Sequence, residues 1–495
     1  MPVVVVEREA APHALPRAAH LDDEALRILA RLGLAEALVV AGRPIAGMDI
    51  VDGRGRRLLR ARKATAATRE HGWPPALLVH QPAVERGLRD AVAACPSVAV
   101  RLGEAVERVA ADAAGVTLHT SGAAGPRELR AAWVVGCDGA RSVVREAMGA
   151  RLRPPRGLGA AEQPWLVVDV RLRDPSAHPV PEPARLLQVA DPDGPRTVVP
   201  FADPRRRWEW RLGPGEAAAA ATRPEAVRAR LAAVVDPDAV EVERAAVYTF
   251  RALVAAPWRR GRLLLAGDAA HQMPPFLGQG LCSGLRDADA LAWRLALVAA
   301  GGAGAPLLDD YAAERRPHAA RVTRLAGWAG RGIGGRGAAA RARNAALRAL
   351  HRLPPLARRL ADVRGDIRPV RAATHGQGVR RLTLVPNAVG GGRLDDALGD
   401  GWAALVRADA APWHALADGP LGRRLGLRVA GGALARDPAL DAAFDGRPAL
   451  LVRPDGHLFG RYAGGASGAA ARDLAAALHL AGEHESTRLE TRPGA

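Results

Sequence analysis

The segment from Gly261 to Ala288 constrains the fold of this chain more than any other part of the sequence. The apolar run 263–266 predicts a short strand that is covered on both faces. Gly267 lets the chain turn sharply, so Asp268 is expected at the carboxyl end of that strand, where open α/β sheets bind ligands. We therefore predict an α/β fold with a ligand site at this strand end.

A rigid loop and a glycine-rich helix start follow this strand. Pro274 and Pro275 fix the path of the loop. Gly278, Gly280 and Gly284 lack the side chains that would keep a flat ligand away from the backbone amides of the helix. A helix N-terminus has unpaired N–H groups and carries about half a positive charge, so it can stabilise an anion. The alternative is an ordinary strand, loop and helix whose aspartate is satisfied locally.

A second acid-tipped strand is predicted between Trp133 and Arg145. Its apolar residues lead to Asp138, and a helix is expected to begin at Ala140 or Arg141. The alternative for this segment is an aspartate that caps the helix and binds no ligand.

A third strand, Val3–Val6, ends at Glu7 near the start of the sequence. In dinucleotide-binding folds, an acid at such a strand end lies about 20 residues after a glycine fingerprint and binds ribose hydroxyls. Only six residues precede Glu7, so the first strand, the fingerprint turn and its helix do not occur in the sequence as written. We expect a weakly held cofactor, an uncovered strand edge and a coding start upstream of Met1. The glycine fingerprint spacing recurs at Gly330–Gly337, but there it comes after a segment with helical spacing and not after a strand. We therefore predict a flexible helix break at Gly330–Gly337.

These segments together resemble the FAD-dependent aromatic hydroxylases, the single-component flavoprotein monooxygenases. The stretches Gln163–Val170 and Arg207–Glu209 are most similar to the 3-(3-hydroxyphenyl)propionate hydroxylase branch. The resemblance implies FAD, NADH or NADPH as co-substrate, dioxygen, and hydroxylation of a phenolic ring through a C4a-hydroperoxyflavin. Two alternatives stay open: a flavin hydroxylase that modifies polyketides or antibiotics, and a flavin-free protein that binds aromatic ligands or a partner without turnover.

The resemblance also implies which residues form the site. Asp268 is expected to bind the flavin ribitol, and the amides of the following helix are expected to face the flavin pyrimidine carbonyl. The implied cofactor contacts are Glu7, Arg17, Gln81, Asp138, Gly139, Asp268, Gly278, Gly280, Leu281 and Cys282. No residue is assigned as catalytic; the cavity candidates are His271, Pro275 and Phe276, with a structural loop role as the alternative for His271.

The predicted fold class is α/β, with a Rossmann-like FAD-binding domain that lacks its first strand. Short apolar runs separated by Pro, Gly and Asp predict an inserted antiparallel sheet, and the resemblance implies that this sheet forms a wall of the substrate cavity. A thioredoxin-like domain is expected at the C-terminus; it lacks Cys-x-x-Cys, so packing or homodimer formation is favoured over redox chemistry. The predicted boundaries are 1–153 and 258–370 for the FAD-binding domain, 154–257 for the substrate domain, 382–482 for the C-terminal domain and 483–495 for a disordered tail.

Composition limits the classes of partner. The three cysteines include no Cys-x-x-Cys pair, which argues against a disulfide scaffold or a zinc site and fits a reducing cytoplasm. The net charge of +18 would ordinarily suggest nucleic acid. However, Lys63 is the only lysine, and the arginines of 315–381 fall at mixed helical positions with few aromatic residues nearby. We therefore expect no nucleic-acid partner, no metal and no membrane span.

Overall fold

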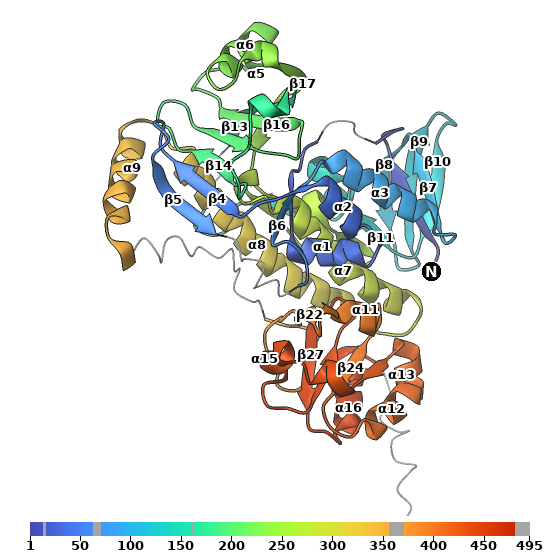
Figure 1. Cartoon of the computed structure of the whole chain (residues 1–495). Helices are drawn as coiled ribbons and strands as arrows, with labels where there is room; N and C mark the ends of the chain where they lie inside the picture. The colour runs from blue at the N-terminus through green and yellow to red at the C-terminus, as the bar shows by residue number, and fades with distance from the viewer. Residues whose placement is uncertain (13–15, 63–70, 160–161, 356–370, 481–495) are drawn as a thin grey trace, which may run out of the picture.

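The computed structural model describes residues 1–12, 16–62, 71–159, 162–355 and 371–480. Figure 1 shows an N-terminal α/β part, an inserted sheet and a C-terminal unit, drawn in orange and red, beside the long helices α7 and α8. The expected tail 483–495 lies outside the described residues.

The strands that carry the predicted motifs form two small parallel pairings. In the first sheet, β11 runs beside β20, which is fully buried as its apolar sequence predicts, and β19 adds an antiparallel edge. In the second, β1 runs parallel to β7. The strands are β1 (Val3–Glu7), β7 (Val98–Leu102), β11 (Val134–Gly136), β19 (Arg259–Arg260) and β20 (Leu263–Leu265).

Strand β1 is poorly covered. Val3, Val4 and Val5 are 37%, 50% and 40% exposed, although valine is usually buried in a sheet of this kind. Among the described strands, β1 pairs only with β7. The uncovered strand expected from the sequence is therefore observed at β1.

Smaller elements complete the N-terminal part. Three sheets of three strands and four helices surround the motif strands. The strands are β2 (His20–Asp22), β3 (Arg43–Pro44), β6 (Ala76–Leu78), β8 (Glu104–Ala111), β9 (Val116–Gly122), β10 (Arg127–Ala131), β12 (Arg151–Arg153), β18 (Leu253–Ala256) and β21 (His271–Gln272), and the helices are α1 (Asp23–Ala30), α2 (Ala35–Ala41), α3 (Gln81–Ala93) and α4 (Val143–Ala147).

The inserted sheet has seven strands in the order β17-β13-β16-β15-β14-β4-β5. All of its pairings are antiparallel except that of β14 with β4. Trp208 and Trp210 lie on one face, in a core shared with two short helices, so the alternate residues of β16 point to the opposite face. The elements are β4 (Gly47–Val51), β5 (Arg57–Arg62), β13 (Gln163–Leu172), β14 (Leu186–Val189), β15 (Arg196–Val199), β16 (Arg205–Arg211), β17 (Val240–Phe250), α5 (Ala218–Ala221) and α6 (Pro224–Ala232).

Helices α7 (Gly280–Ala299), α8 (Leu307–Ile333) and α9 (Gly337–His351) follow the proline-containing loop. The predicted flexible break at Gly330–Gly337 is largely wrong, because α8 continues through Gly330 and ends at Ile333. Gly330 lies against the ring of Phe276, where a Cβ atom would not fit. The glycine thus serves close packing inside a helix, and the break is confined to residues 334–336.

The C-terminal unit is built on a four-stranded mixed sheet in the order β25-β24-β26-β27, with β24 parallel to β25 and antiparallel to β26. Its apolar core continues onto α7 through Trp293. The elements are β22 (Ala388–Val389), β23 (Gly392–Arg393), α11 (Leu394–Leu398), β24 (Ala403–Val406), α12 (Ala411–Asp418), α13 (Pro420–Leu425), β25 (Arg428–Ala430), α14 (Gly432–Ala435), α15 (Asp441–Phe444), β26 (Ala449–Val452), β27 (Leu458–Tyr462) and α16 (Ser467–Ala477).

Two searches of the described residues were negative. None of the described helices has the length and apolar character needed to cross a membrane. No group of three or more His, Cys, Asp or Glu side chains in the described part of the chain could hold a metal ion.

Candidate functional site

The two acid-tipped strands end at the same edge of one sheet. β11 and β20 are parallel and in register, with Gly136 opposite Leu265, and the Ala266 amide donates to the Gly136 carbonyl at 3.1 Å. Asp138 and Asp268 follow these strands by two and three residues. The convergence expected from the sequence is therefore present in the fold.

The carboxylate of Asp138 is engaged locally. It accepts a hydrogen bond from the Ser142 hydroxyl and another from the Val144 amide at 3.1 Å, so it ties the strand end to the first turn of α4. The cap of α4 itself is Ser142, whose hydroxyl oxygen accepts from the Arg145 amide at 2.9 Å, so Asp138 braces the capping residue and the helix start. The role of Asp138 as a flavin contact stays a prediction, as does that of Gly139, which follows it with a positive φ of 76°.

The carboxylate of Asp268, in contrast, is available. Gly267 adopts a φ of 61° and turns the chain so that Asp268 is exposed, and its carboxylate accepts no hydrogen bond from any described residue. Partial desolvation by the surrounding protein raises the pKa of Asp268, while the charges of His271 and Arg17 act to lower it. An exposed acceptor that carries no other hydrogen bond is suited to binding a hydroxyl group.

The start of α7 lies beside the loop that carries Asp268. Gly278 adopts a φ of 64°, and a Cβ atom on it would lie 2.9 Å from the Cβ of His20. No side chain caps the first turn of α7, and a Cβ at Gly280 would meet no atom within 4 Å. The thiol of Cys282 is buried in the core, so only backbone amides from Gly280 to Cys282 can face a ligand.

Two further predicted contacts meet beside the inserted sheet. The side-chain carbonyl of Gln81 accepts from the amides of Arg17 and Ala18, at 2.8 and 2.6 Å. Arg207 of β16 donates to the carbonyl of Arg17 at 3.0 Å. Gln81 thus positions this segment, while the Arg17 side chain stays exposed and its charge acts on Asp268. Glu7 ends β1 in a separate sheet and accepts from the amide of Glu9.

His271 points into the core. It is fully buried, and its Nε2 lies 2.6 Å from an oxygen of Asp287. Its ring stacks on Trp258, with ring centroids 5.7 Å apart. Burial alone would raise the pKa of Asp287, but His271 and Arg315 together lower it. His271 does not line the described pocket, which matches the structural loop alternative.

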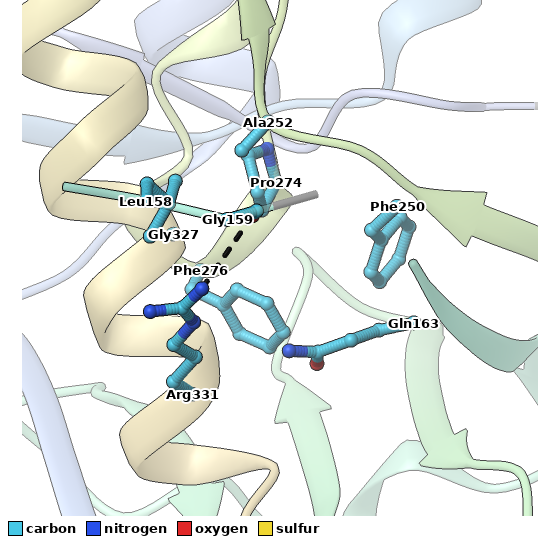
Figure 2. Close-up of a pocket in the computed structure, with 9 residues that line it drawn as sticks. All are labelled: Leu158, Gly159, Gln163, Phe250, Ala252, Pro274, Phe276, Gly327 and Arg331. Atoms are coloured by element: carbon cyan, nitrogen blue, oxygen red, sulfur yellow. Dashed lines mark hydrogen bonds between the residues drawn. The ribbon is translucent and has the colours of Figure 1, made fainter. Parts of the chain in front are cut away.

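An aromatic pocket opens beside the proline loop (Figure 2). The rings of Phe250 and Phe276 lie 6.0 Å apart, and Trp165 packs on Phe276 at 5.3 Å. Pro274 borders the pocket, whereas Pro275 is exposed and Phe276 is buried. The lining residues are Leu158, Gly159, Gln163, Phe250, Ala252, Pro274, Phe276, Gly327 and Arg331.

The sequence analysis missed the polar lining of this pocket. Gln163 begins β13 and Phe250 ends β17, so the two meet across the ladder. Arg331 comes from the last turn of α8 and donates weakly to the Gly159 carbonyl at 3.4 Å. The alternation within β13 could have indicated that Gln163 and Trp165 share a face, but no local signal indicates that Arg331 reaches them.

The FAD binding domain family model matches residues 1–326. The chain belongs to this family. It is 34% identical over 485 residues to a probable NADH-specific resorcinol 4-hydroxylase of Rhodococcus jostii (strain RHA1), covering 92% of this chain and 87% of that protein. It is 40% identical over 319 residues to a 3-(3-hydroxy-phenyl)propionate/3-hydroxycinnamic acid hydroxylase of Mycolicibacterium smegmatis (strain ATCC 700084 / mc(2)155). That alignment covers 64% of this chain and only 54% of the relative's length.

A solved structure agrees over almost the whole chain. The ternary complex of aklavinone-11 hydroxylase with FAD and aklavinone superposes with a TM-score of 0.74 at 26% identity, covering 97% of this chain and 95% of that one. The predicted resemblance to flavoprotein aromatic hydroxylases, the Rossmann-like FAD-binding fold and FAD as cofactor are thereby confirmed. The roles of the individual site residues stay predictions.

Proposed function

We propose that this protein is an FAD-dependent monooxygenase that hydroxylates a single-ring phenol carrying a carboxylate side chain, using NADH or NADPH and dioxygen. The observation that carries the proposal is the unpartnered Asp268 carboxylate beside the uncapped start of α7 and the aromatic pocket. FAD, when bound, takes a hydride from the nicotinamide and activates dioxygen. The protein supplies position, electrostatics and a dry pocket.

The residues present fit a flavin. Asp268 can accept hydrogen bonds from the ribitol hydroxyls, and the amides of residues 280–282 can donate to an electron-rich carbonyl. Gly280 leaves the approach to these amides open, and Gly139 has no neighbouring atom within 4 Å of an added Cβ. The amides at the start of α7 also suit the negative charge that a flavin gains on reduction.

The pocket suits an aromatic acid. Phe250 and Phe276 provide apolar walls that exclude water from a bound ring, and Trp165 packs behind Phe276. Arg331 stands at the pocket with only a long bond to a carbonyl, so its guanidinium can pair with a carboxylate. The name of the M. smegmatis relative specifies phenylpropionate-type acids, whereas that of the R. jostii relative specifies resorcinol, which has no carboxylate. The position of Arg331 supports an aromatic acid over resorcinol as the substrate.

Replacing Asp268 with alanine is expected to weaken FAD binding. A hydrogen bond to a charged group contributes about 1.5–3 kcal/mol, so the dissociation constant should rise by about tenfold to a hundredfold. Fluorescence titration of the full chain with FAD measures this change. Asp90→Ala, an exposed aspartate on α3, is the matched control. Equal affinities for Asp268→Ala and the unchanged protein would remove Asp268 from the site.

Replacing Arg331 with glutamine is expected to change substrate preference. Loss of a charge-assisted bond should lower kcat/KM for 3-(3-hydroxyphenyl)propionate by about tenfold or more, while kcat/KM for resorcinol stays the same. Arg316→Gln, an exposed arginine on the same helix, should alter neither value. A parallel loss with both substrates would show that Arg331 does not read the carboxylate.

One screen tests the proposed function as a whole. The full chain is supplied with FAD, and NADH or NADPH oxidation and hydroxylated product are measured with phenylpropionates, resorcinol and polycyclic phenols. Product from phenylpropionates supports the proposal. Product from polycyclic phenols alone would favour the tailoring alternative, and ligand binding without turnover would favour a non-catalytic protein.

The proposal also includes a cytoplasmic location and a homodimer. Three cysteines without disulfides, of which Cys95 and Cys137 are exposed, support a reducing compartment. Sedimentation of the purified chain at several concentrations measures its oligomeric state.

A further inference from the structure

A buried glutamate lies on the inner face of the seven-stranded sheet. Glu209 on β16 is opposite Val167 of β13 on one side and Thr197 of β15 on the other. Because Trp208 and Trp210 pack on the outer face, Glu209 faces the FAD-binding part of the protein. It is 7% exposed. Its position thus combines a carboxyl group with almost complete burial.

The carboxyl group of Glu209 has no hydrogen-bond partner among the described residues. Its nearest cation is Arg207, at 3.9 Å. The Arg207 guanidinium is already paired with Asp169 at 2.7 and 3.1 Å and also donates to the carbonyls of residues 16 and 17. Arg244 likewise lies 3.8 Å from Asp169 and donates to a carbonyl. Arg207 and Arg244 are therefore engaged mainly with Asp169 and backbone carbonyls. Glu209 has only the long ion pair with Arg207.

Polar residues on the adjoining strands β15 and β14, unlike Glu209, have hydrogen-bond partners. Thr197 donates to the side-chain carbonyl of Gln188 at 2.7 Å, so this pair is internally satisfied. Buried polar groups in folded proteins nearly always have a hydrogen-bond partner, whereas Glu209 has only the long ion pair with Arg207. Glu209 is therefore a weakly paired carboxyl group in a strand region whose other polar side chains are satisfied.

The position of Glu209 relates it to the predicted flavin site. Along the inner face it lies between Arg207, which holds the backbone of Arg17, and the diagonal neighbour Trp165, which packs on Phe276. The charge of Arg17 acts on Asp268, and Phe276 belongs to the loop that leads into α7. The carboxyl group therefore lies on the same side of the sheet as Trp165 and Arg207, the side that contacts the loop before α7 and the segment around Arg17.

We propose that Glu209 binds the phenolic hydroxyl of the aromatic substrate and accepts its proton. This inference rests on the proposed function and names the group that activates the ring. The O–H bond breaks, its electron pair stays on the phenolic oxygen, and the proton moves to a Glu209 carboxylate oxygen. The ring then becomes richer in electrons at the carbons beside and opposite that oxygen. When the hydroxylated carbon later loses its hydrogen as a proton, the phenolic oxygen takes its proton back from Glu209.

The electrostatics agree with this role. Desolvation raises the pKa of Glu209 to about 7, Arg207 lowers it and Asp169 raises it again. The other titratable groups that face this cluster are Arg244 from β17, Arg17 from the segment before β2 and His80 from the segment before α3. A group with a pKa near the working pH transfers protons efficiently in both directions.

A pair of ligands separates this inference from the proposed function. Binding of 3-(3-hydroxyphenyl)propionate and of 3-phenylpropionate, which lacks the hydroxyl, is measured by calorimetry on the full chain supplied with FAD. A site built to bond the hydroxyl should favour the phenol by about tenfold or more. In Glu209→Gln we expect this preference to fall to about twofold or less, with the affinity for 3-phenylpropionate unchanged.

The rate provides a second readout. Proton transfer by a positioned group accelerates a reaction by about a hundredfold or more, so kcat of Glu209→Gln should fall by at least that factor. The variant should also lose the increase of kcat with pH near neutrality. Glu209→Asp should restore part of both. Glu241→Gln, an exposed glutamate on β17, is the matched control.

Each outcome decides one question. The inference is overturned if the unchanged protein binds both ligands equally, or if Glu209→Gln keeps the full preference for the phenol. A preference that depends on Glu209 without any hydroxylated product would retain the binding role and contradict the proposed monooxygenase function instead.

Discussion

Replacing Glu314 with glutamine should destabilise the protein by about 3–5 kcal/mol, the usual cost of removing one partner from a buried ion pair. Glu314 is fully buried on α8 and accepts from Arg294 at 2.7 Å and from Arg453 at 2.9 and 3.1 Å. It also accepts from the amides of Ala373 and Thr374. Because Arg453 belongs to the C-terminal unit, the loss should loosen the junction of that unit with α7 and α8.

The pH dependence of the stability shows whether the ionised Glu314 carboxylate is responsible for this loss. Burial raises the pKa of Glu314, but Arg453 and Arg294 outweigh burial and lower it to about 2. The ordinary value is 4.5, so the ionised form contributes about 3 kcal/mol of stability above pH 4.5. This contribution is lost as the pH falls from 4.5 towards 2. The glutamine variant should lack this acid dependence.

Tryptophan fluorescence reports on the same junction. Trp293 of α7 stacks edge-on with Trp402 at 5.6 Å and donates to Asp455 at 3.0 Å. Urea denaturation at pH 7 and pH 4 should show a large loss for Glu314→Gln at pH 7 and a smaller one at pH 4. Glu225→Gln, which replaces an exposed glutamate on α6, should leave the stability to urea unchanged at both pH values. A Glu314→Gln midpoint equal to that of the unchanged protein at pH 7 would mean that the ion pairs do not stabilise the junction.

The parts of the fold set by local sequence were predictable. The apolar run 263–266 before Asp268 predicted β20, and the apolar residues from Trp133 before Asp138 predicted β11. Parallel strands bring their carboxyl ends to one edge, so the meeting of the two aspartates followed from strand direction alone. The short runs separated by Pro, Gly and Asp likewise predicted the strands of the inserted sheet, β16 among them.

The parts that depend on distant residues were not predictable. His271 points into the core because its imidazole bonds Asp287, which lies on α7, 16 residues later in the chain. Gly330 lies within α8 because Phe276 occupies the space beside it, a contact that glycine spacing does not encode. Glu209 belongs to a strand whose pattern was recognised, but its lack of a partner depends on Asp169 from β13, which already binds Arg207.

Replacing Glu209 with glutamine should stabilise the protein at alkaline pH. A carboxyl group with an ordinary pKa of 4.5 and a folded-state pKa of about 7 binds its proton more tightly in the folded state. Folding therefore loses stability as the pH rises from 4.5 to 7, by about 3 kcal/mol in total. Glutamine cannot ionise, so the variant should gain up to about this amount at pH 8 and almost nothing at pH 4.

Thermal denaturation of both proteins at pH 4 and pH 8 measures the difference, with Glu241→Gln as the control. A gain of the same size at both pH values would point to packing, and no gain at pH 8 would show that the carboxylate is stabilised in the folded state. A variant that is more stable at pH 8 and also slower in turnover would mean that the protein bears the cost of a buried, ionisable carboxyl group for its chemistry. Such opposed effects on stability and activity are typical of functional residues and are not expected of structural ones.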